Sequence, residues 1–176
     1  RDPDQPAVYD FVTRLQFMTL LHFGYDGPSR AKLEALLDAS AEPTLAMLSA
    51  CGEIPYGGRS NQFLHNNTFY AAVCEWYAAR ARRRGDFRLA ARFAGAARAA
   101  VEDLRAWLVL RPMRHVKNLY PRGSGQRGSG IGCEEYAYFD KYMVTMGSWA
   151  MMAYVLADDG DDTAAVEPGD APLAFA

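Results

Sequence analysis

Hydrogen-bonding side chains are concentrated in residues 56–67, directly ahead of a predicted helix. The segment carries seven phenol, guanidinium, amide or imidazole groups: Tyr56, Arg59, Asn61, Gln62, His65, Asn66 and Asn67. A helix N-terminus adds unpaired N–H groups and positive potential, which suit an anionic ligand such as a carboxylate. In a purely structural role, Asn66 or Asn67 would cap the helix and Gly57-Gly58 would form a turn. This role accounts for only part of the seven hydrogen-bonding groups. The segment therefore predicts a ligand site.

A second group of reactive side chains begins at Cys133. Glu134, Tyr138 and Tyr142 fall at helical spacing and share one face, while Glu135 lies on another and Asp140 follows. A carboxyl group at an apolar boundary has a raised pKa, as a general acid requires. The alternative is a structural role, in which these side chains interact with each other on the exposed face of the helix and the acidic residues of its first turn interact favourably with the helix dipole. The candidate catalytic residues are Glu134, Glu135, Asp140, His65 and Tyr138.

Between these clusters, residues 111–132 form a Gly-, Ser- and Arg-rich segment that predicts a long loop. Residues 123–128 match G-x-G-x-x-G, but no strand precedes them, so a dinucleotide site is not expected. A cationic lid that brings His115 and Lys117 to an anionic substrate is one interpretation, and a plain surface loop is the other.

Composition narrows the function classes. The net charge of −2 argues against a nucleic-acid partner, and the arginines at 80–84 are explained by the dipole at a helix C-terminus. No histidine pair has metal-ligand spacing and no Cys-x-x-Cys occurs, so neither a metal nor a cofactor is predicted. No apolar run predicts a membrane span and no signal peptide is visible, which favours the cytoplasm. The chain begins without methionine, so part of a longer protein is also considered.

These residues are expected to lie on an all-α scaffold. Alanine and arginine are abundant and no alternation predicts a strand. Apolar spacing and turn residues predict six helices in antiparallel hairpins, over about 6–23, 29–39, 43–51, 68–84, 86–110 and 133–156. Residues 1–157 would form one helical domain, and the acidic residues 158–176 a flexible tail.

The successive helical hairpins, the polar segment 56–66 that leads into a helix, and the Glu- and Tyr-rich stretch 134–142 resemble part of an (α/α) toroid of bacterial carbohydrate-active enzymes. These include glycoside hydrolases and heparinase- and alginate-lyase-like polysaccharide lyases. A full toroid has about twelve helices, whereas six are predicted here. The resemblance is at the level of fold, so function has to be argued from the sites.

The resemblance implies a carbohydrate substrate, bound where polar loops meet at one end of the toroid. Hydrolysis would use two carboxylates among Glu134, Glu135 and Asp140. Lyase chemistry would instead use Tyr56, Tyr138 or His65 to move protons. In either reaction the substrate-binding residues would be Tyr56, Arg59, Asn61, Gln62, Asn66, His115 and Lys117.

A non-catalytic helical binding or scaffold protein is the alternative from another class. The oligomeric state, including a homo-oligomer, is left open. For an enzyme, His65 and Glu134 are expected to face one cleft.

Overall fold

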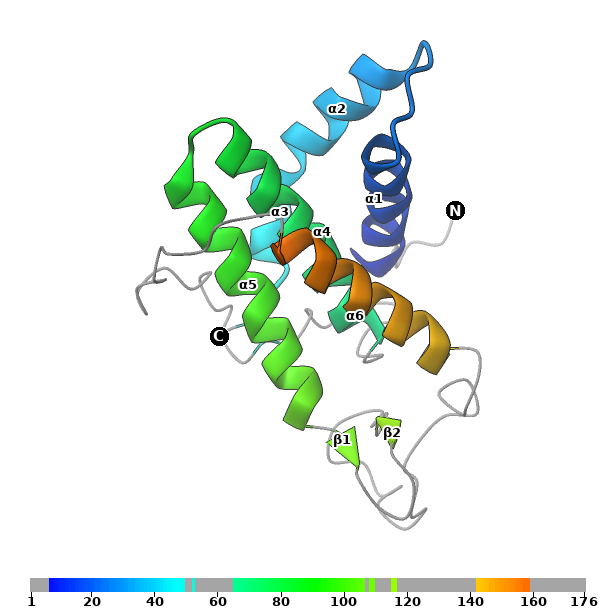
Figure 1. Cartoon of the computed structure of the whole chain (residues 1–176), viewed down its shortest axis with the longest axis vertical. Helices are drawn as coiled ribbons and strands as arrows, with labels where there is room; N and C mark the ends of the chain where they lie inside the picture. Colours follow the sequence, from blue (N-terminus) through cyan, green and yellow to red (C-terminus); the bar gives the residue numbers. More distant parts are fainter. Residues whose placement is uncertain are drawn as a thin grey trace.

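Residues 7–49, 52, 65–106, 108–109, 115–116 and 142–158 are described by the computed structural model (Figure 1). They form six helices and one pair of two-residue strands. In chain order these are α1 (Ala7–His22), α2 (Arg30–Ala39), α3 (Ala41–Ala46), α4 (His65–Arg83), α5 (Phe87–Ala106), β1 (Leu108–Val109), β2 (His115–Val116) and α6 (Tyr142–Asp158). The predicted all-α class with helical hairpins is confirmed. Closure into a toroid stays a prediction.

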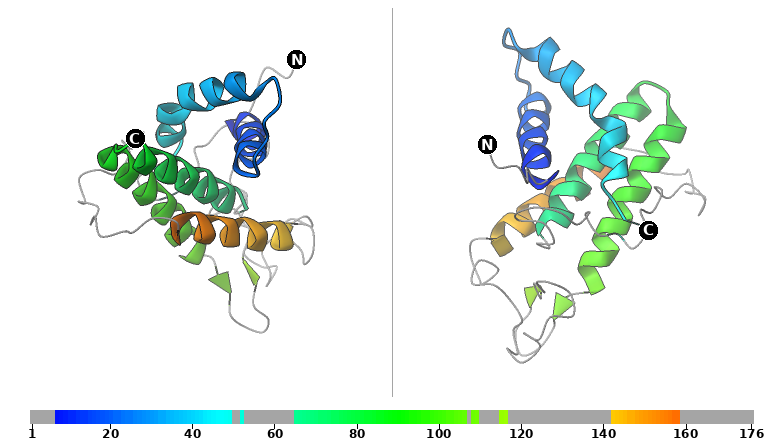
Figure 2. Two further views of the ribbon diagram at one scale, coloured as in Figure 1. Left: turned by 45° about the horizontal axis from the view of Figure 1, so that its top comes forward. Right: turned by 180° about the vertical axis from the view of Figure 1, so that it is seen from behind.

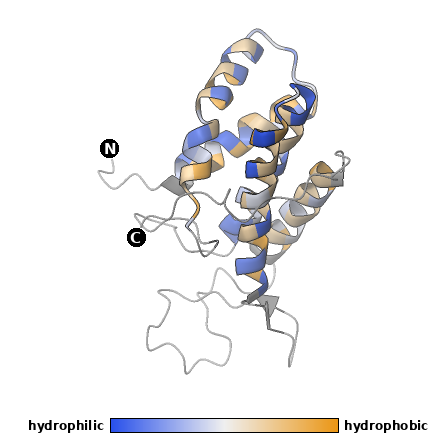
Figure 3. Cartoon of the chain, turned by 90° about the vertical axis from the view of Figure 1, so that its left-hand side faces the viewer, coloured by the Kyte–Doolittle hydropathy of each residue, from blue (hydrophilic) through white to orange (hydrophobic). Residues whose placement is uncertain are grey.

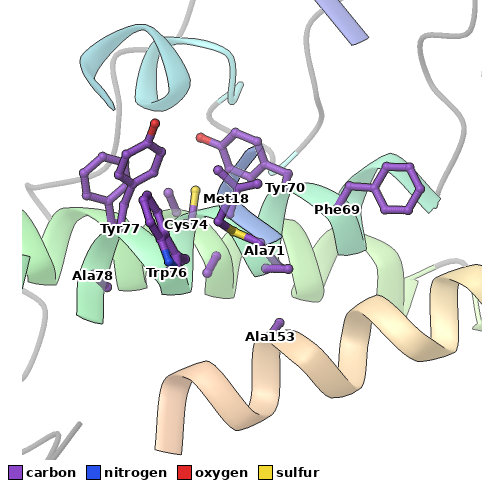
Figure 4. Close-up of a cluster of buried hydrophobic side chains, with 14 of the residues drawn as sticks. Met18, Phe69, Tyr70, Ala71, Cys74, Trp76, Tyr77, Ala78 and Ala153 are labelled. Atoms are coloured by element: carbon purple, nitrogen blue, oxygen red, sulfur yellow. The ribbon is translucent and has the colours of Figure 1, made fainter. Parts of the chain in front are cut away.

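Helix α4 lies at the centre of the described structure. It packs most extensively against α5, with which it forms an antiparallel hairpin, and against α6, while α1 and α3 cover it elsewhere (Figures 1 and 2). Fifteen of its 19 residues are buried, including all of the first ten. Figure 4 shows Tyr70, Cys74 and Tyr77 of this helix in the core, with Met18 on one side and Ala153 of α6 on another.

Local signals end and start several helices where the sequence predicts. Gly24 has a φ of 84°, and the N–H of Tyr25 returns to the carbonyl of Leu20 at 2.9 Å, which closes the end of α1. Gly85, with a φ of 77°, turns the chain between α4 and α5. Asp86 then caps α5, because its Oδ1 accepts from the N–H of Leu89 at 3.0 Å.

Three predicted boundaries differ from the structure. Helix α4 begins at His65, three residues earlier than predicted, so Asn66 and Asn67 lie inside its first turn and are not caps. Helix α5 ends at Ala106 and not near residue 110, and the short strand β1 pairs antiparallel with β2. Helix α3 ends at Ala46, before the predicted end at Gly52. At the start of α4, contacts of Asn67 with Ala100 and Asp103 of α5 override the local pattern.

Helix α6 is almost wholly apolar, and no charged residue occurs between Tyr142 and Ala157. Met146, Ala153 and Leu156 are buried, whereas Val144, Met151 and Tyr154 are exposed. Figure 3 colours the described residues by hydropathy, and the hydrophobic colour prevails along α6. Within the described residues, no helix is both long enough and apolar enough to cross a membrane. The predicted tail begins where α6 ends, and residues 159–176 lie outside the described structure.

Arg14 of α1 is a buried cation that joins three helices. Its side chain is only 3% exposed, and it donates to Thr44 Oγ1 and, at 3.2 Å, to the carbonyl oxygen of Ser40. It also forms an ion pair of 2.7 Å with Asp10, whose side chain is 70% exposed. Arg14 therefore adds a charged donor at the α2–α3 junction, where the carbonyl oxygen of Ser40 also accepts from the N–H of Thr44 at 3.0 Å and from Thr44 Oγ1 at 2.8 Å.

We expect Arg14→Met to lower the free energy of unfolding by about 2–4 kcal/mol, because the acceptors at the α2–α3 junction lose their charged donor. Urea denaturation of both proteins measures the difference. Asp10→Asn is the comparison variant, since it removes the ion pair of Arg14 but leaves its donors to Ser40 and Thr44 in place, and it should cost less than Arg14→Met. Equal effects of the two substitutions would contradict a role for Arg14 at the junction.

Gly52 is needed for close packing against α5. Its φ of 85° favours glycine, and a Cβ there would clash with the carbonyl oxygen of Ala99 and lie 3.0 Å from the Cβ of Asp103. Gly24 has a similar φ of 84° but open space around it. The two glycines therefore share the backbone strain and differ in the clash.

We expect Gly52→Ala to lower the free energy of unfolding by about 2–4 kcal/mol, whereas Gly24→Ala should cost about 1 kcal/mol through backbone strain alone. Thermal and urea unfolding of both variants test the difference. If Gly52→Ala lowers the free energy of unfolding no more than Gly24→Ala does, the close contact of residue 52 with α5 does not require glycine, and only the positive φ does.

Candidate functional site

The start of α4 is a buried polar cluster. His65, Asn66, Asn67 and Thr68 are between 0% and 8% exposed, although all four carry hydrogen-bonding side chains. The first turn of α4 holds no acidic residue. Unpaired N–H groups at a helix start carry positive potential, so the end of α4 that follows segment 56–64 favours a negative group.

Asn67 is fully engaged in the fold. Its Nδ2 donates to the carbonyl oxygen of Ala100 and to Oδ2 of Asp103, each at 3.0 Å, and lies 3.5 Å from the carbonyl oxygen of Gly52. These contacts tie the start of α4 to the last turns of α5 and to the segment that contains Gly52. The amide of Asn67 is therefore structural, which is one of the two roles that the sequence left open.

His65 is the one predicted catalytic residue whose side chain the structure describes. Its ring meets Phe69 edge-on at 5.2 Å, and Phe69 meets Trp149 of α6 at 5.8 Å, so aromatic rings link α4 to α6 at this end. Burial lowers the pKa of His65 to about 4. Its imidazole is therefore neutral at pH 7.

Of the predicted substrate-binding residues, Asn66 is the one with a described side chain, and it is 1% exposed. The structure places the backbone of His115 in β2. The other predicted site residues lie outside the described residues: Tyr56, Arg59, Asn61, Gln62, Lys117, Glu134, Glu135, Tyr138 and Asp140. The shared cleft of His65 and Glu134 therefore stays a prediction.

Two tyrosines on the next turns of α4 were not singled out from the sequence. Tyr70 donates to the carbonyl oxygen of Thr44 at 2.8 Å and Tyr77 to that of Leu37 at 2.7 Å, and Figure 4 shows both hydroxyl groups directed to this side. Burial raises the pKa of Tyr77 to about 12 and that of Tyr70 well above its usual value. Both therefore remain protonated donors that hold α2 and α3 against α4.

Burial also raises the pKa of the Cys74 thiol, so this cysteine is not an activated nucleophile. Among the residues that the structure describes, no three His, Cys, Asp or Glu side chains are grouped to hold a metal ion.

Neither a protein-family model, nor a curated protein, nor a solved structure matches this chain. The function is therefore argued from the residues alone.

The depressed pKa of His65 predicts an acid-labile fold. Unfolded chains protonate histidine near pH 6.5, whereas folded His65 takes a proton only near pH 4. Between these values the unfolded state binds more protons, so stability falls as the pH falls from about 6.5 to 4. At pH 4 the loss due to this one group is on the order of 2–3 kcal/mol.

We expect His65→Gln to flatten this part of the profile, which urea denaturation at intervals from pH 4 to pH 8 measures. His22→Gln, at an exposed histidine on α1, is the control. If His65→Gln leaves the slope between pH 6.5 and 4 as steep as in the parent chain, His65 is not held neutral by burial.

Proposed function

We propose that this chain cleaves glycosidic bonds in poly- or oligosaccharides that contain uronate. The observation that carries the proposal is the start of α4, where a neutral His65 and a buried Asn66 follow directly on the polar segment 56–64. Positive potential at this helix end favours a substrate carboxylate. The all-α hairpin fold is compatible with the toroid that the sequence resembles.

Two reactions fit such a substrate. In hydrolysis, one of Glu134, Glu135 or Asp140 protonates the glycosidic oxygen while a second carboxylate activates water or attacks the sugar. In β-elimination, a base removes the proton next to the uronate carboxylate, a carbon–carbon double bond forms, and the glycosidic oxygen leaves with a proton from an acid such as Tyr138. Hydrolysis by the carboxylates is the first choice, and elimination, with Tyr56, Tyr138 or His65 moving protons, is the alternative.

The second candidate is a non-catalytic helical binding protein. It is favoured by the engagement of Asn67 with Ala100 and Asp103 and by the burial of His65 and Asn66, since all three then serve the fold. A protein of this kind would bind an acidic partner without turnover.

One assay separates these candidates. The purified chain is incubated with a panel of polysaccharides with and without uronate, and both reducing ends and the ultraviolet absorbance of unsaturated sugars are followed. Both signals indicate elimination, reducing ends alone indicate hydrolysis, and neither signal with retained binding indicates the non-catalytic protein.

For an acidic substrate we expect Arg59→Lys to lower activity by orders of magnitude with nearly unchanged thermal stability. A guanidinium binds a carboxylate through two parallel hydrogen bonds that an ammonium group does not reproduce, and losing this contact in a desolvated site costs on the order of 2–5 kcal/mol. Arg98→Lys, at an exposed arginine on α5, is the matched control. If Arg59→Lys unfolds a parent chain that shows no activity, Arg59 is structural.

A further inference from the structure

A pocket of about 530 Å³ opens between the end of α1, the start of α2 and the last turns of α4. Both the α1–α2 connection and the α4–α5 turn lie at this end of the molecule (Figure 1). Four of the side chains that line the pocket are arginines, namely Arg30 from α2 and Arg80, Arg83 and Arg84 from α4 and the turn after it. A volume of this size accommodates a small molecule.

Acidic residues neutralise only part of this charge. Arg80 and Arg84 both donate to Asp38, at 3.1 and 2.9 Å, and Arg30 approaches Glu34 at 3.3 Å. Although partial burial alone would raise the pKa of Asp38, hydrogen bonds from Arg84 and Arg80 lower it, so this carboxylate stays ionised. Asp26 also pairs with Arg30, at 3.9 Å, so four arginines against Asp26, Glu34 and Asp38 leave an excess of one positive charge in a chain whose net charge is −2.

The helix dipole does not account for the arrangement. The C-terminus of α4 carries about half a negative charge, which suits one neighbouring cation. Arg30 faces the pocket from another helix, where its Nη1 also donates to the carbonyl oxygen of Tyr25 at 3.0 Å. Arg83, the last residue of α4, is the cation that the dipole accounts for; it is exposed and forms no ion pair within the described residues. Arg80 is held in place, because its guanidinium stacks 5.2 Å from the ring of Trp76 and binds Asp38.

We propose that this pocket binds a small polyvalent oxyanion, a molecule with two or more carboxylate or phosphate groups. Guanidinium groups match the two oxygens of either group with paired N–H donors, and convergence from two helices sets their spacing. The unpaired Arg83 and the remaining donors of Arg30 and Arg84 supply the contacts, while Asp38 and Glu34 orient the neighbouring arginines.

The pocket is independent of the proposed reaction site. Arg83 and His65 are the two ends of α4, so about 27 Å of helix separates them at 1.5 Å per residue. Failure of one proposal therefore leaves the other standing. Ligand at the pocket would bridge α1 and α2 to α4, and these contacts are less extensive than those of α4 with α5 and α6.

Isothermal titration calorimetry of the purified full chain with pyrophosphate and with citrate tests the proposal and separates phosphate from carboxylate ligands. We expect one-to-one saturable binding of at least one probe, weakened as salt rises. Arg83→Gln should weaken it about tenfold, and Arg83→Glu further, since the reversed charge repels the ligand. Circular dichroism checks that each variant remains folded.

Arg98→Gln is the matched control, because Arg98 is an exposed arginine on α5, which contributes no residue to the pocket. It should change the dissociation constant less than about twofold. The proposal is overturned if neither probe binds, if binding does not saturate at one per chain, or if Arg98→Gln weakens binding as much as Arg83→Gln.

Discussion

Burial of α4 on nearly all sides is the constraint on which the rest of the structure depends. A helix enclosed by its neighbours loses water as a partner, so each polar side chain on it needs a protein donor or acceptor. Tyr70 and Tyr77 meet this need at carbonyl oxygens of α3 and α2, and Asn67 meets it at the end of α5. The same contacts set the positions of the neighbouring helices, because a polar pair fixes a register that apolar packing alone leaves adjustable.

Arg14 is a buried polar side chain on α1 that also finds its partners on neighbouring helices. It follows Phe11 and precedes Leu15 and Met18, all of which are buried, so its guanidinium enters the core on the apolar face of its own helix. The buried charge is acceptable because Ser40, Thr44 and Asp10 surround it with acceptors. The kink between α2 and α3 thus depends on donors from both α1 and α4, and the small helix α3 is held by tertiary contacts more than by its six residues.

Local chemistry made part of this fold predictable from the sequence. Gly24, Gly85 and Asp86 act within a few residues, so the end of α1 and the α4–α5 turn could be placed without tertiary information. The start of α4 could not, because His65-Asn66-Asn67 has the composition of a cap and becomes helical through burial and through contacts with Asp103, 36 residues away. The arginine pocket was missed for a similar reason. Its residues come from three separate segments of the chain. Only the arginines at 80–84 stand out in the sequence, and there the helix dipole is a sufficient explanation.

The two ends of α4 also differ in the charged side chains that surround the helix dipole. At the positive end no acidic side chain stands in the first turn, and the histidine there stays neutral because burial disfavours its charged form. The carboxylate of Asp103, on α5, already places a negative charge beside this helix end, 3.0 Å from Nδ2 of Asn67. At the C-terminal end of α4, the arginines carry more positive charge than the half negative charge of the helix dipole can balance. Asp38 neutralises only part of this excess. Under the two proposals, both ends of α4 would bind anions, the first through backbone N–H groups and the second through guanidinium groups. Salt should distinguish the two mechanisms, because the exposed arginines are screened by ions while a buried helix start is screened far less.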